Sequence, residues 1–524
     1  MALDEDGAAA WWQAGVIYQV YPRSFQDSTG DGVGDLQGIR SRLDHLVDLG
    51  VDAVWISPIY PSPMADFGYD ITDHCDVDPL FGTLDDLDAL LAAAHGRGLR
   101  ILLDLVPGHT SDRHPWFVAS RSSREDPKRE FYIWRDPAPD GGPPNNWVSE
   151  FGGPAWSFDE RTGQYYLHLY LRSQPALNWR HPEVRRAMFD VMRFWLDRGV
   201  DGFRIDAVEH LVVDRHFRDN PPDPDAVPEL GPARQAIRRH TTHQPEVLDI
   251  AREMRALADT YQGDRVLIGE AYGTLEQIMA YYGEHGDGFQ LPFNFQLVGA
   301  DWEPRELASM VDAYEAALPD GAWPNWVLGN HDRSRIASRV GPEQARVAAM
   351  LLLTLRGTPT IYQGDELGMT DVPIPPDAVQ DPWEQQVPGL GLGRDPVRTP
   401  IPWDDTLHAG FSTTTPWLPL GTDTPSAETQ AADPTSMLTL HHRLLDLRRR
   451  EPALTIGDYR SVSAGDAVYV YERHHEGSHL IVALNLTGAD QPLDLTGEVL
   501  LTTHLDNPTA SVLRANEGRI IRPT

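Results

Sequence analysis

The sequence predicts an α/β protein: a (β/α)8 TIM barrel with an inserted domain after its third strand and a C-terminal antiparallel β-sandwich domain. Short apolar runs alternate with stretches whose apolar residues recur at helical spacing, and this alternation repeats about eight times before residue 453. Eight parallel strands of this kind close a barrel. Beyond residue 453, short strands follow one another without intervening helices, which is typical of an antiparallel domain.

The predicted strands and helices follow each other in a regular order. Residues 16–21 form the first apolar run, and the helix that follows ends at Gly50. Thr83 is placed to cap the next helix, and a later amphipathic helix over 184–195 ends at Gly199. The predicted barrel strands are residues 16–21, 51–56, 101–106, 202–207, 266–268, 289–293, 326–328 and 359–362.

Two long segments interrupt the alternation. The first runs from His109 to about Gln174 and is rich in proline, glycine and aromatic residues, and the second spans about 371–435. Long inserts at the carboxyl ends of barrel strands build walls around the mouth of the barrel. The predicted domains are the barrel at 1–108 and 176–452, the inserted domain at 109–175, and the C-terminal domain at 453–524, with strands at 468–471, 480–484 and 498–502.

The composition limits which partners the protein can bind and in which cellular compartment it is expected. The chain has 524 residues and a net charge of −34, so nucleic acid and anionic membrane surfaces would be repelled, whereas a neutral small molecule would not. Cys75 is the only cysteine, which excludes an intramolecular disulfide. Residues 1–10 lack the pattern of a secretory leader, and no run is long and apolar enough to cross a bilayer, so we expect a cytoplasmic protein.

Charged and polar residues occur where the predicted strands end. Arg204 and Asp206 alternate on one strand and therefore share a face, where the arginine favours the ionised carboxylate. A lone Arg-x-Asp pair is more often a structural ion pair than a catalytic one. Here, however, other strands end in His109, Glu270 and the pair His331 and Asp332, and barrel strands deliver their carboxyl ends to one mouth. The sequence thus predicts one pocket at this end of the barrel.

These motifs and their order resemble the α-amylase superfamily, glycoside hydrolase family thirteen, and within it the α-glucosidase and oligo-1,6-glucosidase branch. The resemblance covers nearly the whole chain. The matching stretches are Val-Ile-Tyr-Gln-Val-Tyr-Pro-Arg-Ser-Phe at 16–25, Phe-Gly-Tyr-Asp at 67–70, His-Thr-Ser-Asp at 109–112, Gly-Phe-Arg-Ile-Asp at 202–206, Gly-Glu at 269–270 and Asn-His-Asp at 330–332.

The resemblance implies a catalytic role for three carboxylates. Asp206 would be the nucleophile that forms a covalent β-glucosyl ester, and Glu270 the acid that protonates the leaving oxygen and then activates water as a base. Asp332 would bind the 2- and 3-hydroxyls of the sugar more tightly in the transition state. Arg204 would keep Asp206 ionised. Two inversions at the anomeric carbon give net retention, which implies a retaining, exo-acting α-glucosidase that is also capable of transglucosylation.

The resemblance also implies a binding site for one terminal glucose. Asp66 and Arg398 would clamp the 4- and 6-hydroxyls, while Tyr69 would stack on the ring. The remaining implied contacts are two histidines that donate to hydroxyls and three wall residues of the insert, namely His109, His331, Phe151, Tyr170 and Gln174. Each of them is otherwise an ordinary residue of the rim.

An acidic loop after the first strand is the candidate metal site. Oxygen-bearing positions occur at every second residue around glycines, as in calcium loops, and the positions are Asp27, Thr29, Asp31, Val33 and Asp35. The pattern resembles the first-loop calcium site of the α-glucosidase branch, so we expect structural calcium, with magnesium as the alternative ion and a solvated acidic turn as the alternative structure. Gly108 replaces the asparagine of another family calcium site, which argues against that second site.

Three alternatives remain open at this stage. Ala207 follows the nucleophile where α-1,6-specific relatives carry valine, which favours α-1,4 linkages over the oligo-1,6-glucosidase activity. Trehalose synthase, a glucosyl isomerase, shares a similar run at 205–208. A non-catalytic binding relative, such as an amino-acid-transporter heavy chain, would carry a membrane anchor and lack catalytic carboxylates. This chain retains all three carboxylates, so the enzyme is the preferred hypothesis.

Overall fold

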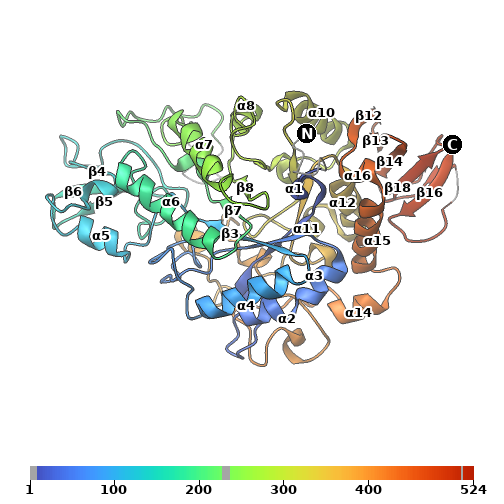
Figure 1. Ribbon diagram of the computed structural model, residues 1–524, viewed down its shortest axis with the longest axis horizontal. Helices are drawn as coiled ribbons and strands as arrows, with labels where there is room; N and C mark the ends of the chain where they lie inside the picture. Colours follow the sequence, from blue (N-terminus) through green and yellow to red (C-terminus); the bar gives the residue numbers. More distant parts are fainter. Residues whose placement is uncertain (1–8, 227–235, 509–510) are drawn as a thin grey trace.

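An eight-stranded parallel sheet forms the centre of the computed structural model, which describes residues 9–226, 236–508 and 511–524 (Figure 1). The strands lie in the order β8-β7-β3-β2-β1-β11-β10-β9, and they are buried along almost their whole length. Their bounds are β1 Ile17–Val20, β2 Ala53–Ile56, β3 Arg100–Leu105, β7 Gly202–Ile205, β8 Val266–Gly269, β9 Phe293–Asn294, β10 Asn325–Val327 and β11 Thr358–Tyr362. The predicted (β/α)8 fold class is confirmed.

The barrel closes between β8 and the segment just before β9 through one backbone hydrogen bond and two hydrogen bonds of the Gln290 side chain. Leu291 N–H donates to the Leu267 carbonyl at 3.2 Å, while the Gln290 amide accepts from Leu267 N–H at 3.0 Å and donates to the Arg265 carbonyl at 2.8 Å. The sixth strand was predicted at 289–293, but regular pairing begins only at Phe293. The Phe289 ring explains this, because it packs directly against Gly269. A Cβ atom added at residue 269 would lie only 2.4 Å from Phe289 Cδ2.

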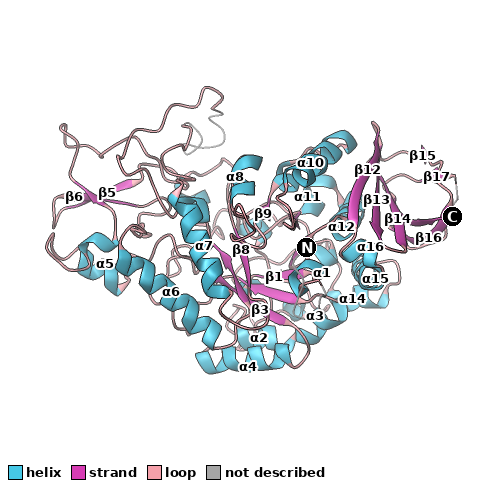
Figure 2. Cartoon of the chain, turned by 45° about the horizontal axis from the view of Figure 1, so that its top comes forward, coloured by secondary structure: helices cyan, strands magenta, loops and turns pink. Residues whose placement is uncertain are grey.

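Helices cover the outside of the barrel (Figures 1 and 2). Local signals set their ends: Asp35 caps α2, Thr83 and Asp86 form the capping box of α4, and Gly50 ends α3 in the left-handed region at φ 100°. The helices of the barrel are α1 Trp11–Ala14, α2 Leu36–Ser41, α3 Leu43–Leu49, α4 Leu84–His95, α6 Pro182–Asp197, α7 Glu246–Ala258, α8 Leu275–Ala280, α9 Gln296–Gly299, α10 Pro304–Ala317, α11 Ile336–Val340, α12 Pro342–Thr354 and α15 Met437–Arg450, with the short helix η1 at Pro22–Ser24.

The insert after β3 forms a small unit at one end of the molecule, where Figure 1 labels α5 and β4 to β6. Its three strands pair antiparallel in the order β4-β6-β5. The rings of Phe117, Trp134 and Tyr166 pack against one another beside this sheet. The elements of the insert are α5 Pro115–Ser120, η2 Arg129–Phe131, β4 Trp134–Arg135, β5 Trp156–Asp159 and β6 Gln164–Leu167.

The second long segment folds as short helices and turns that return to the first loop of the barrel. Asp27 N–H donates to the Phe411 carbonyl at 3.0 Å, and Trp417 N–H donates to the Gly32 carbonyl at 2.9 Å. Its elements are α13 Pro382–Gln386, η7 Asp395–Val397, η8 Leu407–Gly410 and α14 Ala427–Ala432. Two further short helices follow barrel strands, η3 Val208–His210 after β7 and η6 Asp365–Leu367 after β11.

The C-terminal region is antiparallel and lies at the opposite end of the molecule from the insert (Figure 2). A five-stranded sheet in the order β12-β13-β14-β18-β16 shares an apolar cluster with the pair β15 and β17. The buried Arg473 ties this sheet to the barrel by donating to the Gly457 carbonyl at 2.7 Å and to the Thr354 carbonyl at 2.5 Å. The elements are α16 Pro452–Thr455, β12 Asp458–Ala464, β13 Val468–His475, β14 Ser478–Asn485, β15 Gln491–Pro492, β16 Gly497–Thr502, β17 Val512–Leu513 and β18 Gly518–Pro523.

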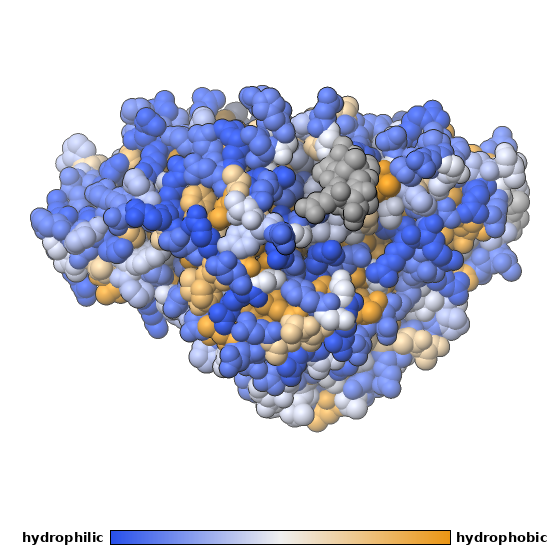
Figure 3. Space-filling view, in the orientation of Figure 1, coloured by the Kyte–Doolittle hydropathy of each residue, from blue (hydrophilic) through white to orange (hydrophobic). Residues whose placement is uncertain are grey.

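The sequence prediction missed two strands of this sheet, β12 and β18. The edge strand β12 alternates exposed and half-buried residues and includes few apolar side chains, so it lacks the apolar run that marked the other strands. Hydrophilic side chains dominate the face of the molecule in Figure 3. Among the described residues, no helix has the length and apolar character that crossing a membrane requires.

Candidate active site

The site is centred on Arg204, a fully buried residue of β7. Its Nη1 donates to Asp104 Oδ1 at 2.6 Å and to Asp206 Oδ1 at 2.8 Å, and its Nη2 donates to Glu270 Oε2. The three carboxylates come from three adjacent strands, because β3 pairs with β7 and β7 pairs with β8. A single guanidinium therefore joins the two predicted catalytic carboxylates, Asp206 and Glu270.

Asp104 is the member of this cluster that the sequence prediction missed. It is fully buried and also accepts from the Tyr69 hydroxyl at 3.1 Å and from Trp55 Nε1 at 3.3 Å. Burial raises the pKa of Asp104 to about 6, against the opposing effect of Arg204. A signal was present in the sequence, since an aspartate inside an apolar strand needs a buried partner.

The cluster has more negative than positive charge. Burial raises the pKa of Asp206 well above its usual range, and Glu270 and Asp104 add to the effect while Arg204 opposes it. One guanidinium cannot compensate three carboxylates in a site of low dielectric constant. We therefore expect the cluster to hold at least one proton at neutral pH before substrate enters.

A strained turn directly after Asp206 is hydrogen-bonded to Glu270. Ala207 lies in the left-handed region at φ 43° and ψ 47°, a conformation that costs an alanine roughly 1 kcal/mol. Its N–H donates to Glu270 Oε2 at 3.1 Å, and the next N–H, of Val208, donates to the Glu270 carbonyl at 2.9 Å. The turn thus fixes Asp206 and Glu270 relative to each other.

A second cluster joins Asp332 to two arginines. Arg398 Nη2 lies 2.6 Å and Arg394 Nη1 3.4 Å from Asp332 Oδ1, and Arg394 Nη2 also donates to Asp66 Oδ1 at 2.8 Å. Burial disfavours ionisation of Asp332, but His331 and the two arginines hold its pKa well below its usual range. Asp381 supports Arg394 from behind, at 2.6 Å from Nη2. We name Asp66, Asp332 and Arg394 the clamp.

The structure corrects the prediction that Arg398 clamps the 4- and 6-hydroxyls together with Asp66, because Arg398 does not line the pocket. Arg398 is fully buried, donates through Nε to the His331 carbonyl at 2.8 Å, and lies behind Asp332. Arg394 contacts Asp66 and lines the pocket instead. Both arginines belong to the same loop, four residues apart, and their order in the sequence does not tell which one reaches the pocket.

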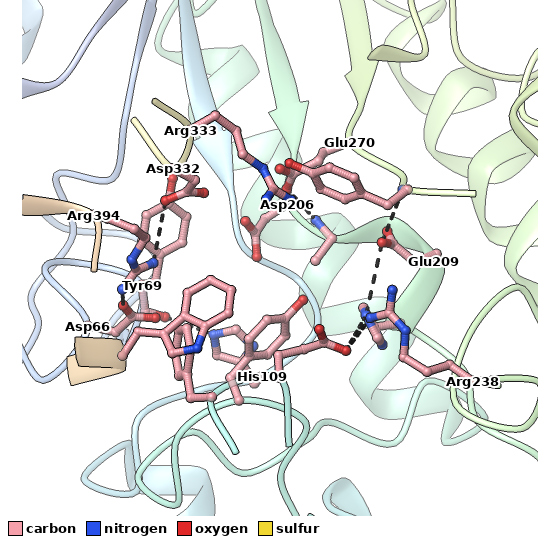
Figure 4. Close-up of a pocket in the computed structure, with 17 residues that line it drawn as sticks. Asp66, Tyr69, His109, Asp206, Glu209, Arg238, Glu270, Asp332, Arg333 and Arg394 are labelled. Carbon is pink, nitrogen blue, oxygen red and sulfur yellow. Dashed lines mark hydrogen bonds and ion pairs between the residues drawn. The ribbon is translucent and has the colours of Figure 1, made fainter. Parts of the chain in front are cut away.

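The clamp and the Arg204 cluster face a cavity of about 810 Å³ at the mouth of the barrel (Figure 4). Eight of the predicted residues line it, namely Asp66, Tyr69, His109, Phe151, Tyr170, Asp206, Glu270 and Asp332. Ala207, which the sequence analysis linked to the preferred linkage, also lines it. The lining residues without a predicted site role are Glu150, Glu209, His210, Arg238, Tyr272, Arg333, Trp383 and Arg394. They belong to η3, to loops that connect barrel strands with helices and to the two long inserts, where no motif marked them.

Arg204, Gln174, His331 and Arg398 lie behind the residues that line the cavity, which corrects the predicted direct contacts of Gln174, His331 and Arg398, whereas Arg204 lies beside Asp206 as its predicted role requires. Gln174 Nε2 donates to Asp66 Oδ2 at 3.0 Å and lies 3.2 Å from His109 Nε2. Both ring nitrogens of His331 are already engaged, at 2.8 Å from Gln19 Nε2 and 2.8 Å from the Tyr69 hydroxyl. Burial lowers the pKa of His331 to about 3, so the ring is neutral.

Tyr69 lines the cavity and also supports it. Its ring is stacked on His331, with the centroids 5.6 Å apart and the planes within 2° of parallel. Its hydroxyl reaches Asp104, so the residue connects the Arg204 cluster with the clamp side of the pocket. Opposite the strand ends, the Phe151 ring of the insert meets Trp383 of α13 with centroids 5.4 Å apart, which joins the two inserts over the cavity.

The acidic loop at 27–35 is held by its own hydrogen bonds. Asp27 accepts from the N–H groups of Gly30 at 2.7 Å and Gly32 at 2.8 Å, and from the Ser412 hydroxyl at 2.6 Å. Asp35 accepts from Ser28 and Gly38. Within residues 9–226, 236–508 and 511–524, three or more acidic, histidine or cysteine side chains nowhere gather as a metal site. The calcium site stays a prediction.

Comparison with known proteins decides the family. The model of the α-amylase catalytic domain matches residues 19–457. The chain belongs to the α-amylase superfamily. Within this family of glycoside hydrolases it falls in the α-glucosidase branch: it is 42% identical to a probable alpha-glucosidase of Rhizobium meliloti, over 91% of this chain and 89% of that protein. It is also 38% identical to an oligo-1,6-glucosidase of Heyndrickxia coagulans, over 97% of this chain and 99% of the relative.

Solved structures of this family have the same fold. The alpha-glucosyl transfer enzyme XgtA superposes with a TM-score of 0.92 at 39% identity, covering 98% of this chain and 100% of that one. The trehalulose synthase MutB from Pseudomonas mesoacidophila superposes with a TM-score of 0.90 at 34% identity, covering 98% and 99%. The family thus includes glucosidases, a glucosyl transfer enzyme and a trehalulose synthase on one scaffold, and the site must decide among them.

Proposed function

We propose that this member of the family is a retaining, exo-acting α-glucosidase that releases α-glucose from the non-reducing end of short α-glucosides. The observation that carries the proposal is the bridge formed by Arg204, because one guanidinium contacts both Asp206 and Glu270. Such closeness favours the separation of about 5–5.5 Å found in retaining enzymes over the ~6.5–9.5 Å of inverting ones.

The reaction follows from the chemistry of the two carboxyl groups. In the first step an Asp206 carboxylate oxygen bonds to the anomeric carbon, while protonated Glu270 transfers its proton to the leaving oxygen and the glycosidic bond breaks. In the second step ionised Glu270 removes a proton from water, whose oxygen displaces Asp206 from the anomeric carbon. The excess of carboxylates around Arg204 supports a proton held in the cluster for the first step.

The clamp supports exo action. Asp66, Arg394 and Asp332 are tied together at one side of the cavity, and Gln174 closes the space behind Asp66. These contacts close that side of the cavity, which supports binding of a terminal sugar whose 4-hydroxyl is free. The paired charges of the clamp match the hydroxyls of a neutral hexose.

The α-1,4 preference rests on Ala207. Its left-handed conformation disfavours a β-branched residue such as valine, the residue that the α-1,6-specific relatives tend to carry. The relatives' names include an alpha-glucosidase, an oligo-1,6-glucosidase, an alpha-glucosyl transfer enzyme and a trehalulose synthase, and an acceptor sugar that outcompetes water at the ester would give transfer. The cytoplasmic location stays a prediction.

Two assays test the proposal. Wild-type protein should release p-nitrophenol from p-nitrophenyl α-glucoside, and the first glucose detected by NMR should be the α-anomer. No release, or a β-anomer as first product, would overturn it. Product chromatography with maltose, isomaltose, sucrose and trehalose then ranks the linkages, with maltose expected first and free glucose as the main product. A dominant new disaccharide from sucrose or maltose would assign the isomerase instead.

A further inference from the structure

Glu209 is a cavity-lining carboxyl group without a role in the reaction above. It belongs to η3, three residues after Asp206, and only 2% of its surface is exposed. Its Oε1 accepts from Tyr272 N–H at 3.2 Å, whereas Oε2 has no hydrogen-bond partner in the part of the chain that the structure describes. An unpaired buried oxygen is destabilising and calls for an explanation.

Reciprocal hydrogen bonds fix Glu209 relative to Glu270. Ala207 N–H, on the Glu209 side, donates to the Glu270 carboxylate, and Tyr272 N–H, on the Glu270 side, donates to the Glu209 carboxyl group. The two side chains are therefore held at a set spacing by the same pair of backbone segments. Glu209 and Glu270 therefore line the same cavity at a fixed spacing.

Figure 4 places Glu209 on the side of the catalytic pair that faces away from the clamp. Asp66, Asp332 and Arg394 lie on one side of Asp206 and Glu270, and Glu209 and Arg238 lie on the other. If the clamp holds the terminal glucose, the group that departs must occupy the Glu209 side. The cavity is lined there by Glu150, Glu209, His210 and Arg238, which we name the leaving-group wall.

The surroundings of Glu209 favour its neutral form. Burial raises its pKa to about 8, with a further contribution from Glu270. The charged or titratable groups that face it from the surrounding segments are His210 on η3, Glu270 and Tyr272 after β8, Glu150 and Tyr170 of the insert, Arg238 and His243 of the segment before α7, and Tyr281 after α8. A neutral carboxyl group has an O–H that can donate a hydrogen bond.

We propose that Glu209 is a specificity-determining residue, whose Oε2 donates a hydrogen bond to a hydroxyl of the sugar that leaves in hydrolysis and that attacks in transfer. The inference rests on the proposed glucosidase function and adds the substrate class that the leaving-group wall favours, a hydroxylated sugar over an apolar aglycone. Phenyl α-glucoside has the same terminal glucose but no hydroxyl on its leaving group, so it serves as the matched substrate.

Substitution at position 209 tests the proposal on both substrates. We expect E209A to lower kcat/KM about tenfold for maltose but less than twofold for phenyl α-glucoside, since only maltose loses a hydrogen bond. E209Q should stay within about threefold of wild type on maltose, because the amide also donates. Glu253→Gln, a change of an exposed ion pair on α7, is the control and should leave both values unchanged.

Equal losses on the two substrates would overturn the proposal and make Glu209 a support for the Tyr272 segment. Unchanged maltose activity in E209A would overturn it as well. E209L keeps the volume without the hydrogen bond, so a selective maltose loss there excludes a collapse of the cavity as its cause. If wild type releases glucose from neither substrate, the glucosidase function fails and this inference fails with it.

The pH dependence gives an independent readout. Because the pKa of Glu209 is about 8, the donor is present below that pH and is lost as the pH rises through it. The ratio of kcat/KM for maltose to that for phenyl α-glucoside should fall severalfold between pH 7 and about pH 9.5 in wild type. In E209Q it should stay flat. A flat wild-type ratio, or one that falls equally in E209Q, would overturn the proposal.

Discussion

The two sides of the cavity hold their carboxyl groups in opposite ways. On the clamp side, Asp332 lies 2.6 Å from Arg398, and arginine contacts hold its pKa well below the usual range. On the leaving-group wall, no arginine within the described part of the chain is hydrogen-bonded to Glu209, and burial raises its pKa to about 8. Both residues are acidic and near Glu270, so their environments and not their chemical type set their charge.

This difference matches what each side has to bind. A terminal glucose offers the same hydroxyls in every substrate, and a clamp of fixed charges with several cross-links suits one invariant ligand. The leaving group varies from substrate to substrate. A neutral carboxyl group can donate or accept a hydrogen bond and repels no catalytic carboxylate, so it suits a variable partner.

The largest expected effect comes from the residue between the two sides. Asp206→Asn removes the nucleophile, so kcat should fall at least about 10⁴-fold with maltose and phenyl α-glucoside alike. The melting temperature should change by only a few degrees, because Arg204 keeps Asp104 and Glu270 as partners. Asp190→Asn on the exposed face of α6 is the control. Release of glucose at the wild-type rate would remove Asp206 from its role.

Asp66→Asn tests the clamp. The change removes one charge while Arg394 keeps Asp381 and Asp332, so the fold should persist. We expect kcat/KM to fall about 100-fold on both substrates, since both present the same terminal glucose. Steady-state kinetics with maltose and phenyl α-glucoside measure this. A loss confined to maltose would place Asp66 with the leaving group and break the division between the two sides.

Ala207→Val tests the turn between the two sides. A β-branched residue in the left-handed region should lower the free energy of unfolding by about 1–2 kcal/mol, and Ala207→Gly should keep or slightly raise it. Urea unfolding measures both variants. The valine variant should also release less glucose from maltose and more from isomaltose than wild type does. Equal stability of the two variants would show that the conformation at position 207 is not strained.

The smallest expected effect concerns the acidic loop, which lies outside both sides of the cavity. If calcium binds at 27–35, excess chelator should lower the melting temperature by a few degrees, and added calcium should restore it. If magnesium restores the melting temperature in place of calcium, magnesium is the bound ion. An unchanged melting temperature after long dialysis against chelator would assign the loop to its hydrogen bonds through Asp27 and Asp35 alone.

Sequence by itself determined the frame of this protein. The order of strands and helices, the insert after β3 and the C-terminal sheet followed from hydrophobic periodicity and helix ends, which are local properties. Strand-end motifs also located Asp206, Glu270 and Asp332, because parallel strands deliver their carboxyl ends to one mouth whatever the details of packing. Asp104 could have been found in the same way, as a lone acid in an apolar strand.

Only the tertiary structure decided which residues of the loops reach the cavity. It selected Arg394 over Arg398 for contact with Asp66 and placed Gln174 and His331 behind the wall. It also brought Glu209 and Arg238 to the leaving-group wall. The physical reason is that side-chain direction in loops depends on long-range packing and on which charges are buried together, and neither has a period that a sequence can display.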